Sequence, residues 1–148
     1  MAKTTPRPDL AAMIMPLGRA LAEAELPVLR AHDLTMWGYA VLLRLEEEPV
    51  RAQAALAQSI GADKTRIIGV LDDLQDRGLI SRERDPADRR VHLVSLSEKG
   101  GRVRAAAQAA IQRREDALLT RIPAVDRKPF LRALRLLSEL PPEDITGS

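Results

Sequence analysis

The stretch from residue 63 to residue 100 concentrates side chains that bind phosphates and the edges of nucleic-acid bases. It reads DKTRIIGVLDDLQDRGLISRERDPADRRVHLVSLSEKG. Arginine forks onto phosphate oxygens and onto the O6 and N7 atoms of guanine, and threonine hydroxyls bond to phosphates or base edges. Such residues lie at the start of a helix and again in the loop behind it, and this placement indicates binding to a nucleic acid.

The first element of this stretch is an expected helix that begins behind Asp63 and ends at Gly78. Ile67, Val70, Leu71 and Leu74 recur at helical spacing and form its expected inner face. The residues expected on the outward side near its start are Lys64, Thr65, Arg66, Gly69 and Asp73.

Gly69 costs up to about 1 kcal/mol in an exposed helix interior. Close approach of the helix to DNA is one explanation for a glycine at this position. On this helix alone, a solvated first turn explains Lys64, Thr65 and Arg66 equally well. The surrounding elements must decide.

A shorter helix is expected upstream, in QAALAQSI at residues 53–60, with Gly61 as its end. Two helices joined by a three- to four-residue turn that contains glycine match the helix-turn-helix pattern. Two strands are expected downstream, LISRER at 79–84 and VHLVSL at 91–96, with the loop RDPADRR between them. A hairpin behind a recognition helix is the layout of a winged helix.

The tip of a wing reaches the neighbouring minor groove, and narrow minor grooves accept an inserted arginine. Either Arg89 or Arg90 is expected to insert, while the other pairs with Asp88 and stiffens the loop. Arg82 and Arg84 alternate on the first strand, so both are expected to face one side and reach phosphates. A solvated basic hairpin is the alternative, and the position behind the helix-turn-helix favours DNA.

Helical patterns flank this region on both sides. Asp9 is the expected cap of a first helix in which Pro16 and Pro27 predict a kink or a late start. The expected caps of the second and fifth helices are Thr35 and Ser97, and a last helix follows Pro123. Six helices and one hairpin predict a mainly α single domain over 1–148.

The 63–100 stretch resembles the DNA-binding segment of MarR-family transcriptional regulators. The resemblance rests on RGLI after a Leu-x-x-Leu helix end, on DPxDRR in the wing and on LSEKG at the start of the next helix. It implies a winged helix-turn-helix homodimer that straddles a pseudopalindromic operator. Dimerisation helices are then expected at about 9–30 and 97–140, with a DNA-binding lobe at about 35–96.

The resemblance also assigns roles to individual residues. Thr65, Arg66 and Gly69 take positions that face the major groove, and Arg89 takes the wing tip. Some family members carry a contacting side chain where this chain has Gly69, so base readout is expected to depend more on Arg66. The resemblance makes Asp88 and Arg90 the pair expected to brace the wing, and leaves open whether Arg89 or Arg90 inserts.

Dimer formation has support that is independent of the resemblance. The first, fifth and sixth expected helices are rich in Leu and Ala over long stretches. One small domain cannot easily cover all three stripes, and exposed apolar area of that extent is typical of an association surface.

Many relatives bind a small aromatic carboxylate beside the dimer helices, and the resemblance places His32, Trp37 and Tyr39 near that crevice. The alternative, which we favour, is that Trp37 is a core anchor and that His32 caps a helix end. Arg30 and Arg44 are possible carboxylate partners.

Composition excludes other classes of function. The chain has no cysteine and two histidines, so thiolate metal sites, disulfides and histidine cages are not expected. No cofactor is expected, and we find no nucleophile–base pair or phosphate-cradling loop that would indicate an enzyme. Without an apolar run of about 20 residues or a leader in MAKTTPRPD, the expected location is cytoplasmic, with no membrane partner.

The sequence therefore predicts a DNA-binding regulator that acts as a repressor. Release of the regulator from its operator by a small ligand is a further expectation. A winged-helix module for protein–protein docking is the alternative, with Asp72, Asp73 and Asp76 as its basis.

Overall fold

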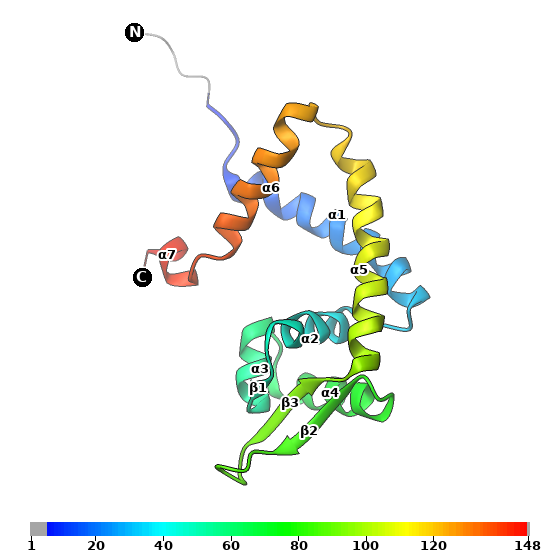
Figure 1. Ribbon diagram of the computed structural model, residues 1–148. Coiled ribbons are helices and arrows are strands. Elements are labelled where there is room, and N and C mark those ends of the chain that lie inside the picture. The colour runs from blue at the N-terminus through cyan, green and yellow to red at the C-terminus, as the bar shows by residue number, and fades with distance from the viewer. Residues whose placement is uncertain (1–5, 148) are drawn as a thin grey trace. The chain divides into compact units, whose positions relative to one another are not determined.

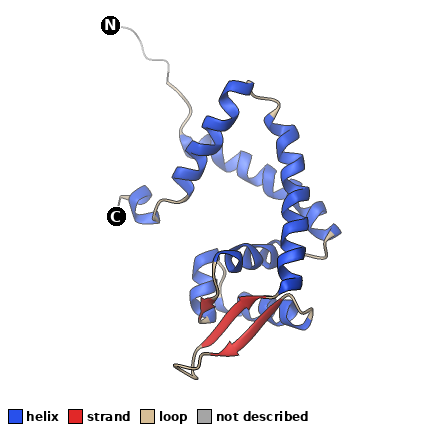
Figure 2. Cartoon of the chain, in the orientation of Figure 1, coloured by secondary structure: helices blue, strands red, loops and turns tan. Residues whose placement is uncertain are grey.

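The computed structural model describes residues 6–147, which form seven helices and one three-stranded antiparallel sheet (Figures 1 and 2). The helices are α1 (Leu10–Ala31), α2 (Met36–Glu47), α3 (Gln53–Ile60), α4 (Lys64–Asp76), α5 (Glu98–Leu119), α6 (Ala124–Ser138) and α7 (Pro142–Thr146). The strands are β1 (Val50–Arg51), β2 (Ile80–Arg84) and β3 (His92–Leu96). The predicted mainly helical class is confirmed, and β1 and α7 add to the predicted elements.

The chain forms two compact units, one through Ile111 and one from Gln112 onward. Residues 1–5, in the expected N-terminal arm, lie outside the described part of the chain.

The predicted helix ends have local causes in the structure. Three side chains accept a hydrogen bond from a backbone N–H in the first helical turn, as is usual for capping residues. The pairs are Thr35 with Gly38 (3.0 Å), Asp63 with Arg66 (2.7 Å) and Ser97 with Gly100 (2.9 Å). Gly61 and Gly78 follow the ends of α3 and α4 with φ of +76° and +72°, which glycine adopts without strain.

The expectation of a late start for the first helix is wrong. Helix α1 begins at Leu10 and continues through Pro16 and Pro27. Each proline removes one donor to the carbonyl four residues earlier. Those carbonyls belong to Ala12 and Glu23, which are exposed in this chain. Solvent can therefore reach the carbonyls that lack a helical donor. Asp9 precedes the helix, but its side chain makes no capping hydrogen bond.

The core lies in the first unit, between α2, α3, α4 and the sheet. Its fully buried large side chains are Leu29, Leu42, Leu56, Ile67, Leu71, Leu74, Leu79, Val41 and Val94. The strand order is β1-β3-β2, and Val94 of β3 pairs with Val50 on one side and Arg82 on the other. The far end of the β2–β3 hairpin extends beyond the helices of this unit (Figure 1). We call residues 80–96 the wing.

The base of the wing is fastened to both neighbouring helices. The Ser97 hydroxyl donates to the carbonyl of Gly78 (2.6 Å), and its N–H donates to that of Leu79 (3.0 Å). Lys99 Nζ donates to the carbonyl of Arg77 at 3.1 Å. Gly100 packs against the Leu79 carbonyl so closely that a Cβ at this position would lie 2.0 Å from the oxygen. The ends of α4 and the start of α5 therefore form one rigid junction.

The second unit contains the end of α5 together with α6 and α7. The Arg127 guanidinium donates to the carbonyls of Leu119 (3.0 Å) and Ile122 (3.3 Å), and these bonds hold the turn before α6. Neither α6 nor α7 buries a residue within the described chain.

Candidate nucleic-acid interface

The outward side of α4 carries most of the predicted major-groove residues. Lys64, Thr65 and Arg66 are exposed, whereas Ile67 is buried beneath them. Gly69 is also exposed, and a Cβ built on it would meet no atom within 4 Å. Packing inside the described part of this chain therefore does not require glycine at position 69.

Arg66 lies on the flank of α4 that faces α2. Its guanidinium carbon is 5.7 Å from the centre of the Trp37 ring, within the range of a cation–π interaction. Trp37 is half-buried in the first turn of α2. The indole therefore packs against the Arg66 guanidinium and limits the conformations of that side chain.

Arg82 does not point to solvent as expected. Its guanidinium donates to Asp72 (2.5 Å) and Gln75 (2.5 Å) of α4 and to Gln53 of α3 (2.9 Å). The side chain is 19% exposed. Arg82 thus ties the wing to the helix-turn-helix, and its donors are already engaged.

The loop at the wing tip contains the predicted Asp88–Arg90 pair. The Asp88 carboxylate accepts hydrogen bonds from the Arg90 backbone N–H (3.1 Å) and from its guanidinium (3.2 and 3.4 Å). The side-chain bond from Arg90, and then its backbone bond, hold the pKa of Asp88 below its usual range, and the Arg51 charge adds to this. Asp88 therefore stays ionised, and Arg90 stays engaged with it.

A second pair, which sequence reasoning missed, fastens the loop to β1. Asp85 is buried, and its carboxylate pairs with the Arg51 guanidinium at 2.5 Å. Its other oxygen accepts from the Ala87 N–H at 2.9 Å. Aspartate before Pro86 is a turn signal that the sequence does show. Its partner Arg51 lies 34 positions upstream, so no local pattern reveals the pair.

Arg84 and Arg89 remain available at the wing. Both side chains are exposed, and neither guanidinium makes a hydrogen bond or ion pair within residues 6–147. Arg84 shares the sheet face of Arg82, two residues closer to the tip. With Arg90 bound to Asp88, the geometry leaves Arg89 as the arginine that can insert.

The acidic residues of α4 are largely neutralised. Asp72 pairs with Arg82, and Asp73 lies 3.5 Å from the Arg77 guanidinium. Of the three acids that support the docking alternative, Asp76 alone has no such partner within the described chain. The outer face of α4 is therefore less acidic than its sequence indicates.

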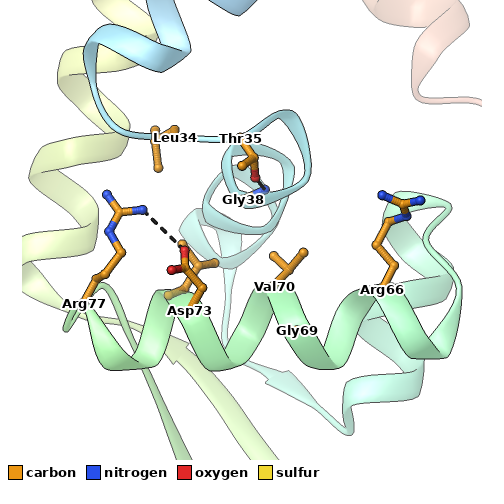
Figure 3. A pocket seen from close by; sticks show the side chains of 9 residues that line it. Leu34, Thr35, Gly38, Arg66, Gly69, Val70, Asp73 and Arg77 are labelled. Carbon is orange, nitrogen blue, oxygen red and sulfur yellow. Dashed lines mark hydrogen bonds and ion pairs between the residues drawn. The ribbon is translucent and has the colours of Figure 1, made fainter.

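A pocket of about 290 Å³ separates α4 from the start of α2 (Figure 3). Leu34, Thr35 and Gly38 line one wall, and Arg66 and Arg77 lie toward its two ends on α4. Its remaining lining residues are Gly69, Val70, Asp73 and Leu74. The pocket thus combines apolar walls with guanidinium groups.

The expected ligand-binding residues do not converge on this pocket. Tyr39 is a buried member of the hydrophobic core. The Nδ1 atom of His32 donates to the Val28 carbonyl at 2.9 Å, at the end of α1. The helix-capping alternative for His32 therefore holds. The core-anchor alternative for Trp37 is wrong, because Trp37 is half-buried outside the hydrophobic core and contacts the Arg66 guanidinium.

The described residues contain neither a metal-ligand cluster nor a helix fit to span a membrane. No three His, Asp or Glu side chains of residues 6–147 gather as metal ligands. None of the described helices combines the length and the hydropathy that a membrane span needs.

Comparison with known proteins decides the family. The family model described as "MarR family" matches residues 34–92. The transcriptional regulator HosA of Escherichia coli O111:H- is 31% identical over 103 residues, which cover 70% of this chain and 76% of HosA. The chain belongs to the MarR family.

Solved structures agree in fold. The transcriptional repressor CouR bound to a 23-mer DNA duplex is 30% identical, covers 88% of this chain and 93% of its own, and has a TM-score of 0.74. CouR from Rhodococcus jostii RHA1 bound to p-coumaroyl-CoA is 27% identical, with coverage of 90% and 94% and a TM-score of 0.71. The expected fold and the expected family of transcriptional regulators are therefore both confirmed.

Proposed function

We propose that this MarR-family protein is a transcriptional repressor that binds a pseudopalindromic operator as a homodimer. The carrying observation is the pairing of an exposed basic face on α4 with a braced wing that keeps Arg89 available. The CouR neighbour, a repressor bound to a DNA duplex, supports the same interpretation. Because the target is a bacterial operator, we place the protein in the cytoplasm.

In this proposal, Lys64, Thr65, Arg66 and Gly69 of α4 lie in the major groove. Arg89 enters the minor groove, and Arg84 binds a phosphate. The residues that hold these groups in place without touching DNA are Arg82, Asp85, Asp88, Arg90 and Arg51. The DNA-binding lobe comprises residues 35–96, and the helices at 9–30 and 97–140 form the dimer.

Effector control is the second part of the proposal. The CouR structure with p-coumaroyl-CoA supports it, because that relative carries an aromatic acyl ligand. In this chain the pocket between α2 and α4 offers apolar walls with Arg66 and Arg77 for an aromatic carboxylate. A ligand there would engage Arg66 and lower operator affinity, which a titration of the operator complex with aromatic carboxylates measures.

The assigned DNA contacts are tested by the double variant Arg66→Ala/Arg89→Ala. On an operator selected in vitro from random duplexes, it should bind no better than it binds random DNA, because one groove contact is lost at each element. Phosphate contacts release counterions, so wild-type affinity should fall steeply with salt. Fluorescence anisotropy gives both quantities.

The matched control is Arg7→Ala/Arg102→Ala, which removes the same charge outside the lobe. Arg7 and Arg102 are both exposed, and Arg102 has only a surface partner, Glu98, at 3.8 Å. The control should keep operator affinity within about threefold. Operator binding by the double variant at wild-type strength would contradict the assignment.

A further inference from the structure

We propose that Ile68 reads the C5-methyl group of a thymine in the major groove of the operator. The inference rests on the proposed function and deepens it, because it names a residue that determines sequence preference. Neither the arginine–guanine contact nor the phosphate contacts distinguish thymine from the other bases.

The position of Ile68 on α4 is the first observation. Ile67, Leu71 and Leu74 are at most 1% exposed and form the inner face of the helix, whereas Ile68 is 49% exposed. Successive helical residues are turned by about 100°, so Ile68 lies on an exposed flank of the helix when its neighbour Ile67 faces the core. Thr65 and Asp72, one turn before and after it, are also exposed.

The second observation is how rare such exposure is in the lobe. Among described residues 35–96, Met36 and Ile68 are the exposed large apolar side chains. The others lie on α1, on α5 beyond Ile111, and on α6, α7 and the segments around them. Those helices belong to the proposed dimer, so association explains their exposed side chains. It does not explain Ile68 on the recognition helix.

The chemistry of the major groove supplies the partner. The thymine C5-methyl is the apolar feature among the base edges there, and it separates A·T pairs from G·C pairs. Around Ile68, the first turn of α4 offers Lys64 and Thr65 for phosphates and polar edges. An isoleucine between them contributes dispersion and apolar contact alone, so a methyl group is its matching target.

The test removes the methyl group from the DNA. Each thymine of the selected operator is replaced singly by deoxyuridine, which keeps base pairing and loses only the C5-methyl. Wild type should bind about fourfold more weakly at one thymine of each half-site, the effect expected from one methylene-sized contact. Ile68→Ala should bind the thymine and deoxyuridine operators equally at that position.

Met36→Ala is the matched control, because it also removes an exposed apolar side chain of the lobe (41% exposed). It should keep the wild-type sensitivity to deoxyuridine. Melting temperatures of both variants confirm the fold. The inference alone is overturned if wild type binds its operator but Ile68→Ala retains every deoxyuridine effect. A protein that selects no duplex at all overturns the proposed function together with it.

Discussion

The Arg66–Trp37 contact changes the role expected of both residues. The sequence predicted that Arg66 contacts the major groove and that Trp37 is either a core anchor or a ligand-binding residue. The structure stacks them at 5.7 Å, so the indole restricts the guanidinium before DNA arrives. A side chain ordered in advance loses less entropy on binding.

This restriction predicts the behaviour of two Trp37 variants. Trp37→Leu should weaken operator binding about two- to fivefold, since an exposed cation–π contact contributes about 0.5–1 kcal/mol. Trp37→Phe, which keeps an aromatic face, should stay within about twofold of wild type. Because Trp37 is the only tryptophan in the chain, its fluorescence in wild type reports operator binding directly.

A double-mutant cycle separates this role from a purely structural one. In an Arg66→Ala background, Trp37→Leu should cause almost no further loss of affinity. Equal losses with and without Arg66 would show that Trp37 acts through the fold and not through the guanidinium.

At the scale of single residues, sequence spacing was informative where partners are close in the chain. The Asp88–Arg90 pair and the Ser97 cap were predicted correctly because each partner lies within three residues. The engagement of Arg82 was not predictable, since Gln53, Asp72 and Gln75 meet it only after folding. Ile68 was not singled out, because it lies three residues before the buried Leu71 and spacing alone does not separate it from the inner face.

At the scale of elements, the α4–wing–α5 junction depends on Gly100. The sequence alone does not distinguish Gly100 from Gly101. The structure separates them, because a Cβ at Gly100 would lie 2.0 Å from the Leu79 carbonyl oxygen, whereas one at Gly101 would lie 3.8 Å from Leu96.

Gly100→Ala should therefore lower stability by about 1–3 kcal/mol, the usual cost of overpacking. For a chain of this size that corresponds to a melting temperature roughly 3–10 °C lower. Gly101→Ala is the matched control and should match or exceed wild type, because alanine favours helix by up to about 1 kcal/mol. Calorimetry compares the two, and equal melting temperatures would argue against the close approach.

Helix boundaries were predictable from sequence because caps are local signals. Strand β1 was not, since its two residues pair with Val94 and Leu93 across more than 40 positions. The short α7 also lacks an apolar period long enough to detect. The prolines of α1 misled in the opposite direction, because the cost of a missing donor depends on whether the opposing carbonyl is exposed.

At the scale of the whole molecule, the uncovered leucines of α6 are the basis for the dimer. Leu131 and Leu134 are 48% and 45% exposed, and the helix buries no residue in the described chain. Exposed apolar area of this extent is typical of an interface. A two-fold dimer places two recognition helices about one DNA turn, roughly 34 Å, apart.

Leu131→Glu/Leu134→Glu should therefore convert the dimer into monomer in analytical ultracentrifugation. Operator affinity should fall by at least tenfold, because the two half-sites are no longer bound by one linked unit. Ile68→Glu is the control for dimer formation, since it places a glutamate on an exposed apolar position of the lobe and should leave the dimer intact. A variant that sediments as wild type would contradict the assignment of α6 to the interface.

The junction at Gly78, Leu79 and Ser97 also bears on how such regulators diversify. It closes the hairpin at its root, and Asp85 fastens the other end to Arg51, so residues 86–90 can vary without changing the scaffold beneath them. Lengthening a closed loop twofold costs only about 0.6 kcal/mol. Wing tips of other lengths and charges should therefore be compatible with the same fold. Minor-groove preference can then change by substitutions in the tip while the positions of the helices stay the same.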